Sequence, residues 1–240
     1  MNASSEQIAT LRKVALGLGD LCDQVVFLGG ATIGLLITDP GAEEARPTID
    51  VDLIIEVASK GEYYEKLCKR LRARGFREDS REGAPLCRWL FDEQAVDVMP
   101  TDPQILGFSN AWYSHALATA ARVTLTSGTG EPAVINLISA PSFLATKLTS
   151  FASRGAGDLL HRDVEDIIAL VDGRVELVRE VEADTLELGA FVAQSMRALF
   201  DAGLEEYVAS HLPGDSASQA REPLVLQRLR RLARITESGT

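Results

Sequence analysis

The stretch TIDVDLIIEV, residues 48–57, decides the fold of this chain because it is the clearest strand in the sequence. Its first half alternates acidic and apolar residues, and its second half is almost entirely apolar. Since successive side chains of a strand point to opposite faces, Asp50 and Asp52 project to one side and Val51 and Leu53 to the other. The stretch therefore predicts a strand that buries one face and presents two carboxylates on the other.

Two carboxylates so close together need a partner of opposite charge. Asp50 and Asp52 repel each other unless a cation lies between them. Magnesium prefers such oxygen ligands, and substrate phosphates and water complete its octahedron. Taken alone, the pattern is more typical of an exposed strand face with two solvated acids. The neighbouring segments therefore decide between the two interpretations.

A pair of glycines precedes this strand. The apolar run 24–28 is expected to be a short buried strand that ends at Gly29-Gly30, and a brief helical turn follows. Backbone amides at such a turn can approach phosphate oxygens because no side chain intervenes. The hydroxyl of Thr32 could add a contact. The alternative is a tight turn without a ligand, which is the better interpretation of a glycine pair considered alone.

A third acid lies on a later predicted strand, in Val96-Asp97-Val98. If this strand pairs beside residues 50–52, three carboxylates converge on one face. Three acids suit a two-metal phosphoryl transfer, in which one metal activates the attacking hydroxyl and the other holds the leaving pyrophosphate. Asp97 would complete the first metal site and help to deprotonate the hydroxyl. The alternative is an acid on an edge strand, because the sequence does not determine the strand order.

The remaining pattern divides the chain into a mixed α/β half, 1–140, and a helical half, 141–240. Ser4 is expected to cap a first helix. Further strands are predicted over 86–91, 95–99, 122–126 and 133–138. Helices are predicted over 62–74, 142–154, 161–172, 175–200 and 221–236, and 38–47 is expected to be a polar loop.

Composition narrows the classes of function. The chain has 240 residues, of which 46% are hydrophobic, and it has no apolar run long enough for a membrane span. Its three cysteines are scattered, as in reduced cytosolic proteins, and form no zinc pattern. We expect a cytoplasmic location and no membrane partner. The net charge of −11 disfavours a large nucleic-acid footprint but allows a local basic patch.

The order of these motifs resembles the nucleotidyltransferases of the DNA polymerase β superfamily. Their pattern is a strand, a glycine pair, a short helix, a DxD strand and a single Asp on a later strand. The second half resembles the AbiEii-type branch, the toxins of type IV toxin–antitoxin pairs. The segments that carry this second resemblance are FLATKL (143–148), Arg154-Gly155 and RDVEDI (162–167). The resemblance spans residues 25–175 and implies an α/β, mixed-sheet nucleotidyltransferase domain followed by a helical domain.

The resemblance also implies roles for individual residues. Gly29 and Gly30 would cradle the triphosphate, and the two aspartates at 50 and 52 would ligate magnesium. Lys147 would reach the nucleotide phosphates as a mobile point charge. Asp163 matches the first acid of the helical motif, which positions the lysine or the substrate. The branch lacks a uniform counterpart of Asp97, whose role rests on the wider superfamily.

Each of these residues also has a purely structural interpretation. Lys147 could lie along a solvent-facing helix side, and Arg162 and Asp166 could form an ordinary surface pair. The arginines at 228, 230, 231 and 234 form the dense basic cluster of an acidic chain. A solvated helix face explains that cluster more simply, and contact with an RNA backbone is the alternative.

The sequence thus leads to three hypotheses about function. The first is a magnesium-dependent enzyme that transfers a nucleoside monophosphate from an NTP to the 3′ end of tRNA, as a toxin with a cognate antitoxin. The second is an antibiotic nucleotidyltransferase, because an acidic cleft attracts a cationic aminoglycoside. The third is a catalytically silent nucleotide-binding module, against which the intact pair of aspartates argues.

Overall fold

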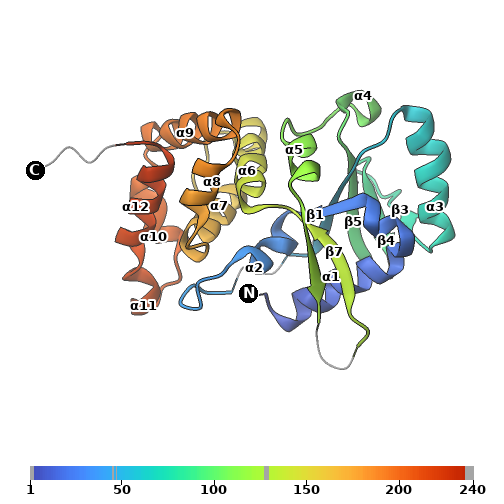
Figure 1. Ribbon diagram of the computed structural model, residues 1–240, viewed down its shortest axis with the longest axis horizontal. Coiled ribbons are helices and arrows are strands. Elements are labelled where there is room, and N and C mark those ends of the chain that lie inside the picture. The colour runs from blue at the N-terminus through green and yellow to red at the C-terminus, as the bar shows by residue number, and fades with distance from the viewer. Residues whose placement is uncertain (1–2, 45, 47, 127–129, 236–240) are drawn as a thin grey trace, which may run out of the picture. The chain divides into compact units, whose positions relative to one another are not determined.

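The computed structural model describes residues 3–44, 46, 48–126 and 130–235. Its chain packs as two compact units, and each is treated by itself (Figure 1). The α/β unit comprises 3–32 and 46–139. The helical unit comprises 140–240 together with 33–45, a segment that the sequence analysis had assigned to the first half.

The α/β unit contains a mixed sheet of seven strands among its described residues, in the order β3-β4-β5-β2-β1-β7-β6. The pairs β2–β5 and β1–β7 are parallel and the other pairs are antiparallel. The strands are β1 (Val25–Leu28), β2 (Asp50–Ile55), β3 (Arg77–Glu78), β4 (Arg88–Phe91), β5 (Gln94–Pro100), β6 (Ala121–Leu125) and β7 (Ala133–Leu137). The ends of the six predicted strands agree with the structure to within two residues. The short strand β3 was not predicted from the sequence.

The central strand β2 behaves as its alternation predicts. Val51, Leu53 and Ile54 are completely buried, whereas Asp50 and Asp52 remain partly exposed. Burial of each large aliphatic side chain contributes about 1.5–3 kcal/mol, which anchors β2 between β1 and β5. This anchoring holds the two carboxylates on a rigid strand.

Helix α1 (Ser5–Leu18) begins at the predicted cap, where Ser4 Oγ accepts a hydrogen bond from the Gln7 amide at 3.2 Å. Its apolar side is buried through Leu11, Val14 and Leu18. The other helical segments of this unit are η1 (Gly19–Gln24), η2 (Gly30–Thr32), η3 (Glu62–Leu67), which continues into α3 (Cys68–Ala73), α4 (Pro103–Leu106) and α5 (Tyr113–Ala118).

The helical unit is built around two helices, α6 (Ala140–Arg154) and α7 (Arg162–Gly173). The predicted single helix over 175–200 is wrong, because the chain breaks into α8 (Leu177–Ala183) and α9 (Leu186–Asp201). The backbone of Asp184 is extended there. Thr185 then caps the start of α9, because its side chain accepts a hydrogen bond from the backbone amide of Leu188. The remaining segments are α2 (Ile33–Leu36), η4 (Leu204–Tyr207), α10 (Val208–His211), α11 (Ser216–Gln219) and α12 (Glu222–Leu232).

The segment after the glycine pair joins this unit through the end of α7. The backbone amides of Thr38 and Asp39 both donate to the Gly173 carbonyl at 2.9 Å, and Arg174 Nη1 donates to the Leu36 carbonyl at 2.9 Å. A β-carbon on Gly173 would lie 2.7 Å from Ile37, so glycine is needed for this close packing. The predicted polar loop is therefore pinned to α7 at its start.

Candidate active site

The sheet brings the predicted carboxylates to one face. Asp50 and Asp52 alternate with buried residues on β2, and Asp97 on β5 lies opposite Asp52 in the parallel register. Paired residues on neighbouring strands share a face. The pairing on which the three-carboxylate interpretation depends is therefore present, and Asp97 does not lie on an edge strand.

The glycine turn lies against the second aspartate. Gly29 directly follows Leu28, which pairs with Asp52 across β1 and β2. Gly29 has φ +75°, and a β-carbon there would lie 1.9 Å from Asp52 Oδ2. A β-carbon on Gly30 would instead meet Thr48 at 3.5 Å, an ordinary contact. Only Gly29 is therefore required by the geometry of the turn.

Thr32 has a different role from the predicted nucleotide contact. It is completely buried, and its hydroxyl donates to the Gly29 carbonyl at 2.9 Å. Its backbone amide donates to the same carbonyl at 3.1 Å. Thr32 thus fixes the glycine turn.

A cation that the sequence analysis missed occupies the carboxylate face. Arg88 on β4 pairs with Asp97 in the antiparallel register, and its Nε and Nη2 donate to the two Asp97 oxygens, each at 2.8 Å. The same Nη2 donates to Asp50 Oδ2 at 3.1 Å. The hydrogen bonds to Asp97, together with the charges of Asp97 and Asp50, raise the pKa of Arg88 further despite its partial burial, so the guanidinium is a permanent charge.

This arrangement bears on the expected metal site. Within the described ranges, no three His, Cys, Asp or Glu side chains gather as a ligand set for a metal ion. Asp50 and Asp52 nevertheless fit magnesium, because proteins commonly bind it with one or two carboxylates and substrate phosphates. The missing β-carbon of Gly29 leaves room around Asp52 Oδ2. Asp50 Oδ1 accepts the Thr48 hydroxyl at 2.8 Å, which orients that carboxylate.

A hollow of about 370 Å³ opens beside Asp50. Its lining comes from the start of α1, the glycine turn, the approach to β2 and the turn between β4 and β5. The residues are Ser4, Glu6, Gln7, Thr10, Ala31, Thr48, Ile49, Asp50, Glu93 and Gln94. Gln7 is 8% exposed, and the nitrogen and oxygen of its side-chain amide have no hydrogen-bond partner among the described residues.

In the helical unit, Lys147 and Asp163 lie together as the family resemblance implied. Lys147 Nζ on α6 is 3.4 Å from Asp163 Oδ1 and 2.6 Å from Asp166 Oδ2, both on α7. Lys147 is 9% exposed and lies 5.6 Å from the centre of the Phe143 ring. The solvent-facing interpretation of Lys147 is therefore wrong, as is the surface pair between Arg162 and Asp166.

Asp163 is the centre of this cluster and is completely buried. Arg154 donates hydrogen bonds to both carboxylate oxygens of Asp163, at 2.9 and 3.0 Å. The backbone amide of Asp163 donates a hydrogen bond to His161 Nδ1. Burial opposes ionisation of Asp163, but the hydrogen bonds from Arg154 and the charges of Lys147 and Arg154 outweigh it and lower the pKa of this carboxyl. The cluster fixes the lysine ammonium at one place on the helix pair.

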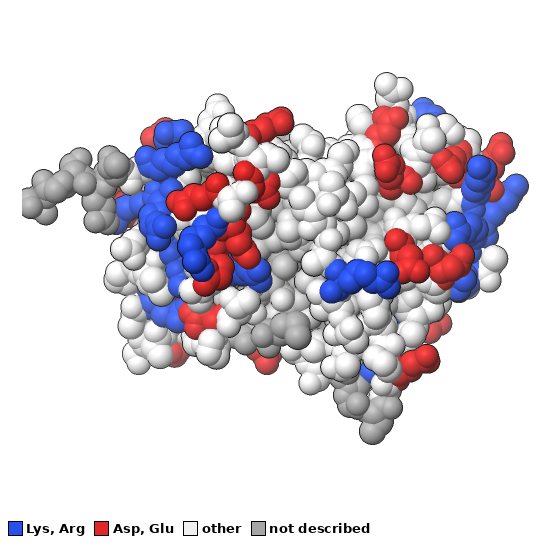
Figure 2. Space-filling model, viewed as in Figure 1, with Lys and Arg blue, Asp and Glu red and all other residues white. Residues whose placement is uncertain are grey.

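The arginines of α12 are largely committed to contacts within the helical unit. Arg228 donates to the carbonyls of Val171 and Asp172 at the end of α7, where a cation is favourable. Arg230 pairs with Glu205. Figure 2 shows positive and negative side chains interspersed over this unit. Contacts within the unit thus account for Arg228 and Arg230, whereas the sequence favoured a solvated helix face for the whole cluster.

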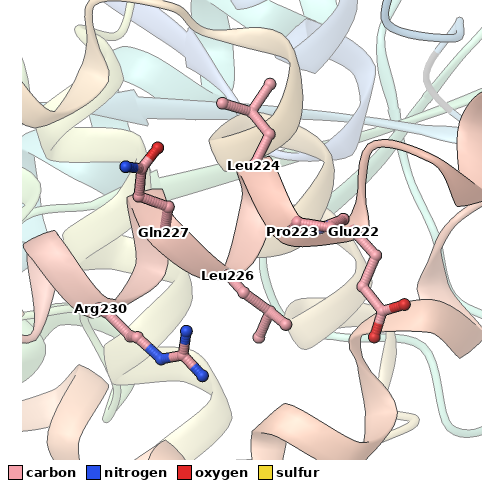
Figure 3. Close-up of a pocket in the computed structure, with 6 residues that line it drawn as sticks. All are labelled: Glu222, Pro223, Leu224, Leu226, Gln227 and Arg230. Carbon is pink, nitrogen blue, oxygen red and sulfur yellow. The ribbon is translucent and has the colours of Figure 1, made fainter. Parts of the chain in front are cut away.

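A second hollow lies along α12 itself. Figure 3 shows its lining side chains, Glu222, Pro223, Leu224, Leu226, Gln227 and Arg230, all of which belong to this one helix. Ligand sites need polar groups that converge from several elements, and a single helix does not offer them. This hollow is therefore not a candidate ligand site.

A strand, a glycine turn and a DxD strand inside a mixed sheet define a nucleotidyltransferase of the DNA polymerase β superfamily. Residues 14–234 match the family described as "Nucleotidyl transferase AbiEii toxin, Type IV TA system". The chain therefore belongs to the AbiEii nucleotidyltransferase family. No curated protein matches the chain.

Two solved structures resemble the chain at low identity. A nucleotidyltransferase-like antigenic protein from Paracoccidioides brasiliensis is 24% identical, with a TM-score of 0.46, over 83% of this chain and 93% of that one. The antibiotic-resistance factor ANT(2'')-Ia is 16% identical, with a TM-score of 0.47, over 86% of this chain and 98% of that one. The family assignment rests on the match over residues 14–234. No helix in the described part of the chain is long and apolar enough to cross a membrane.

Proposed function

We propose that this nucleotidyltransferase moves a nucleoside monophosphate from an NTP to a hydroxyl at the 3′ end of tRNA, with magnesium held by Asp50 and Asp52. The observation that carries the chemistry is the position of these two carboxylates on one strand face beside the Gly29 turn. In the reaction, the acceptor oxygen bonds to the α-phosphorus, the bond to the pyrophosphate oxygen breaks, and the acceptor proton passes to a base.

Each group of residues has a task in this scheme. When bound, magnesium neutralises phosphate charge and lowers the pKa of the attacking hydroxyl. Asp50 and Asp52 would hold it on a strand whose apolar side is buried, and Thr48 orients Asp50. The backbone at Gly29-Gly30 binds phosphate oxygens. Lys147 is the proposed nucleotide contact of the helical unit, where Asp163 and Asp166 fix its ammonium.

The family supports a role in a type IV toxin–antitoxin pair, so we propose an antitoxin as the partner and the cytoplasm as the place of action. For the acceptor, the net charge of −11 opposes a polyanion. An antibiotic acceptor is the second candidate, favoured by the acidic hollow that Glu6, Asp50 and Glu93 line.

The experiment that separates these acceptors incubates the protein with each α-labelled NTP, magnesium and either purified tRNA or an aminoglycoside. We expect label on the tRNA 3′ end from one or more NTPs. Label on the aminoglycoside alone would leave the transferase chemistry intact and overturn the tRNA acceptor.

A further inference from the structure

The position of Arg88 raises the question of how many metal ions this site holds. Its guanidinium bonds both oxygens of Asp97 and one oxygen of Asp50. The side chains are sheltered, with 22% of Arg88, 11% of Asp97 and 27% of Asp50 exposed. A sheltered, forked guanidinium–carboxylate pair is held more tightly than a surface ion pair.

The register of the sheet makes this pair a built-in feature. Arg88 faces Asp97 on β4–β5, and Asp97 faces Asp52 on β5–β2. One cationic and three anionic side chains therefore share one sheet face, and the cation already satisfies Asp97. A metal ion that used Asp97 would have to displace a guanidinium whose charge cannot be removed by deprotonation.

We propose that Arg88 takes the place of one metal ion: Asp97 holds Arg88, and without nucleotide the chain binds a single divalent cation through Asp50 and Asp52. Arg88 is thus a positioning residue that keeps Asp50 oriented and neutralises part of the carboxylate charge. The inference rests on the proposed metal role of Asp50 and Asp52.

The test is titration with Mn²⁺ alone, followed by electron paramagnetic resonance, so that it does not depend on transfer activity. We expect one Mn²⁺ in the wild type and one in Asp97→Asn. In Arg88→Met, Asp50 and Asp97 lose their shared cation, and we expect a second Mn²⁺ or an affinity at least about tenfold higher. The double variant Arg88→Met/Asp97→Asn should return to one ion.

Melting temperatures supply a second readout. Without metal, Arg88→Met should melt below the wild type because its carboxylates repel, and Mn²⁺ should raise its melting temperature more than that of the wild type. The matched control is Arg77→Met on the neighbouring strand, whose exposed side chain pairs with Glu93. This control should bind Mn²⁺ as the wild type does.

The contradicting results are distinct. Loss of Mn²⁺ in Asp97→Asn would make Asp97 a ligand and overturn this inference. An unchanged count and affinity in Arg88→Met would overturn it as well, because Arg88 would then not take the place of a metal ion. Absence of Mn²⁺ binding in the wild type would overturn the proposed metal function of Asp50 and Asp52 as well.

A separate observation concerns the hollow beside Asp50. The side-chain amide of Gln7 is buried there, and neither its nitrogen nor its oxygen has a partner among the described residues, which is costly unless a ligand supplies the hydrogen bonds. The carboxylates of Glu6, Asp50 and Glu93 disfavour a phosphate in the same space. A ligand there must be uncharged or cationic and must offer a donor beside an acceptor.

We infer that this hollow takes a nucleobase, read by the Gln7 carboxamide through paired hydrogen bonds, as glutamine reads adenine. The base belongs either to the NTP or to the acceptor terminus. This inference too rests on the proposed function, because Asp50 places the hollow beside the reacting phosphate.

The variant Gln7→Leu tests it, with Gln24→Leu as the matched control. Gln24 lies outside the lining of the hollow, and its side-chain amide already donates to the Asp20 carbonyl and accepts a hydrogen bond from Arg70. We expect Gln7→Leu to melt no lower than the wild type and to weaken one ligand about tenfold. Gln24→Leu should melt slightly lower and leave every ligand affinity unchanged.

Calorimetry with ATP, GTP, CTP, UTP and inorganic tripolyphosphate, each with magnesium, forms the first arm, and an RNA oligonucleotide without NTP forms the second. A change for an NTP or for the RNA identifies the source of the base. Unchanged affinities in both arms, an equal loss for tripolyphosphate, or a lower melting temperature of Gln7→Leu would overturn the inference. Nucleotide binding without any transfer would instead count against the proposed function.

Discussion

Gly29 and Asp52 are fitted to each other: a β-carbon on the glycine would lie 1.9 Å from the aspartate Oδ2. The glycine also adopts φ +75°, which L-residues with side chains rarely do. The turn that is proposed to bind phosphates therefore also determines where the Asp52 carboxylate, a proposed metal ligand, can lie.

Replacement of Gly29 by Ala should displace Asp52 and lower transfer by about a hundredfold, with a loss of about 1–2 kcal/mol in the free energy of unfolding. Gly30→Ala is the matched control, since its β-carbon makes only an ordinary contact with Thr48. It should unfold like the wild type. Transfer assays and urea denaturation measure both effects, and equal stability of the two variants would contradict the expected fit.

Asp163→Asn should destabilise the helical unit by about 3 kcal/mol, because Lys147 and Arg154 lose a buried partner. The folded-state pKa of Asp163 lies below its unfolded value. Its contribution is therefore complete above the unfolded pKa, near 4, and is lost as the pH falls through the folded pKa.

The stability difference between wild type and Asp163→Asn should thus be constant from about pH 5 to 7 and shrink below about pH 4. Urea denaturation across this range measures it. Glu187→Gln, an exposed acid in the first turn of α9, is the control and should show little difference. A difference that grows on acidification would contradict the ion-pair account.

Lys147→Ala should weaken NTP binding more than Asp166→Asn does, although both variants lose the ion pair at 2.6 Å. The reason is that only the lysine is proposed to meet phosphate. Calorimetry well below the melting temperatures separates this effect from stability. Equal affinities in the two variants would limit Lys147 to holding α6 against α7.

The arginines of α12 provide a test of the tRNA acceptor. Arg231→Gln should weaken tRNA labelling and flatten its salt dependence if this helix meets the RNA backbone, since Arg231 is mostly exposed and its ion pair with Glu182 is long, at 3.9 Å. Arg228→Gln should instead lower stability, because it breaks the contacts with the end of α7. Labelling by Arg231→Gln equal to the wild type would remove α12 from the RNA contact.

Much of the carboxylate site could be predicted from local pattern alone. The alternation around Asp50 and Asp52 predicts their common face, and the glycine pair after a buried strand predicts the turn. Arg88 was missed because its partner depends on register. The two-residue turn at Asp92-Glu93, with both φ values positive, fixes Arg88 opposite Asp97, yet this dipeptide lacks the glycine that usually marks such a hairpin.

Tertiary packing explains the other misses. The break between α8 and α9 depends on an extended Asp184 inside a pattern that otherwise reads as one helix. The segment 33–45 belongs to the helical unit through hydrogen bonds to Gly173 and Arg174, which are distant in sequence. A local sequence pattern cannot predict hydrogen bonds between segments so far apart in the chain.

The most direct test of the central claim compares the wild type with Asp50→Asn and Asp52→Asn in transfer of label from α-labelled NTP in the presence of magnesium. Each substitution removes one proposed metal ligand while keeping the shape of the side chain, so transfer should fall by about a hundredfold or more. The melting temperatures without metal should stay within a few degrees of the wild type. Transfer by either variant at the wild-type rate would contradict the assignment of Asp50 and Asp52 as the metal-binding pair.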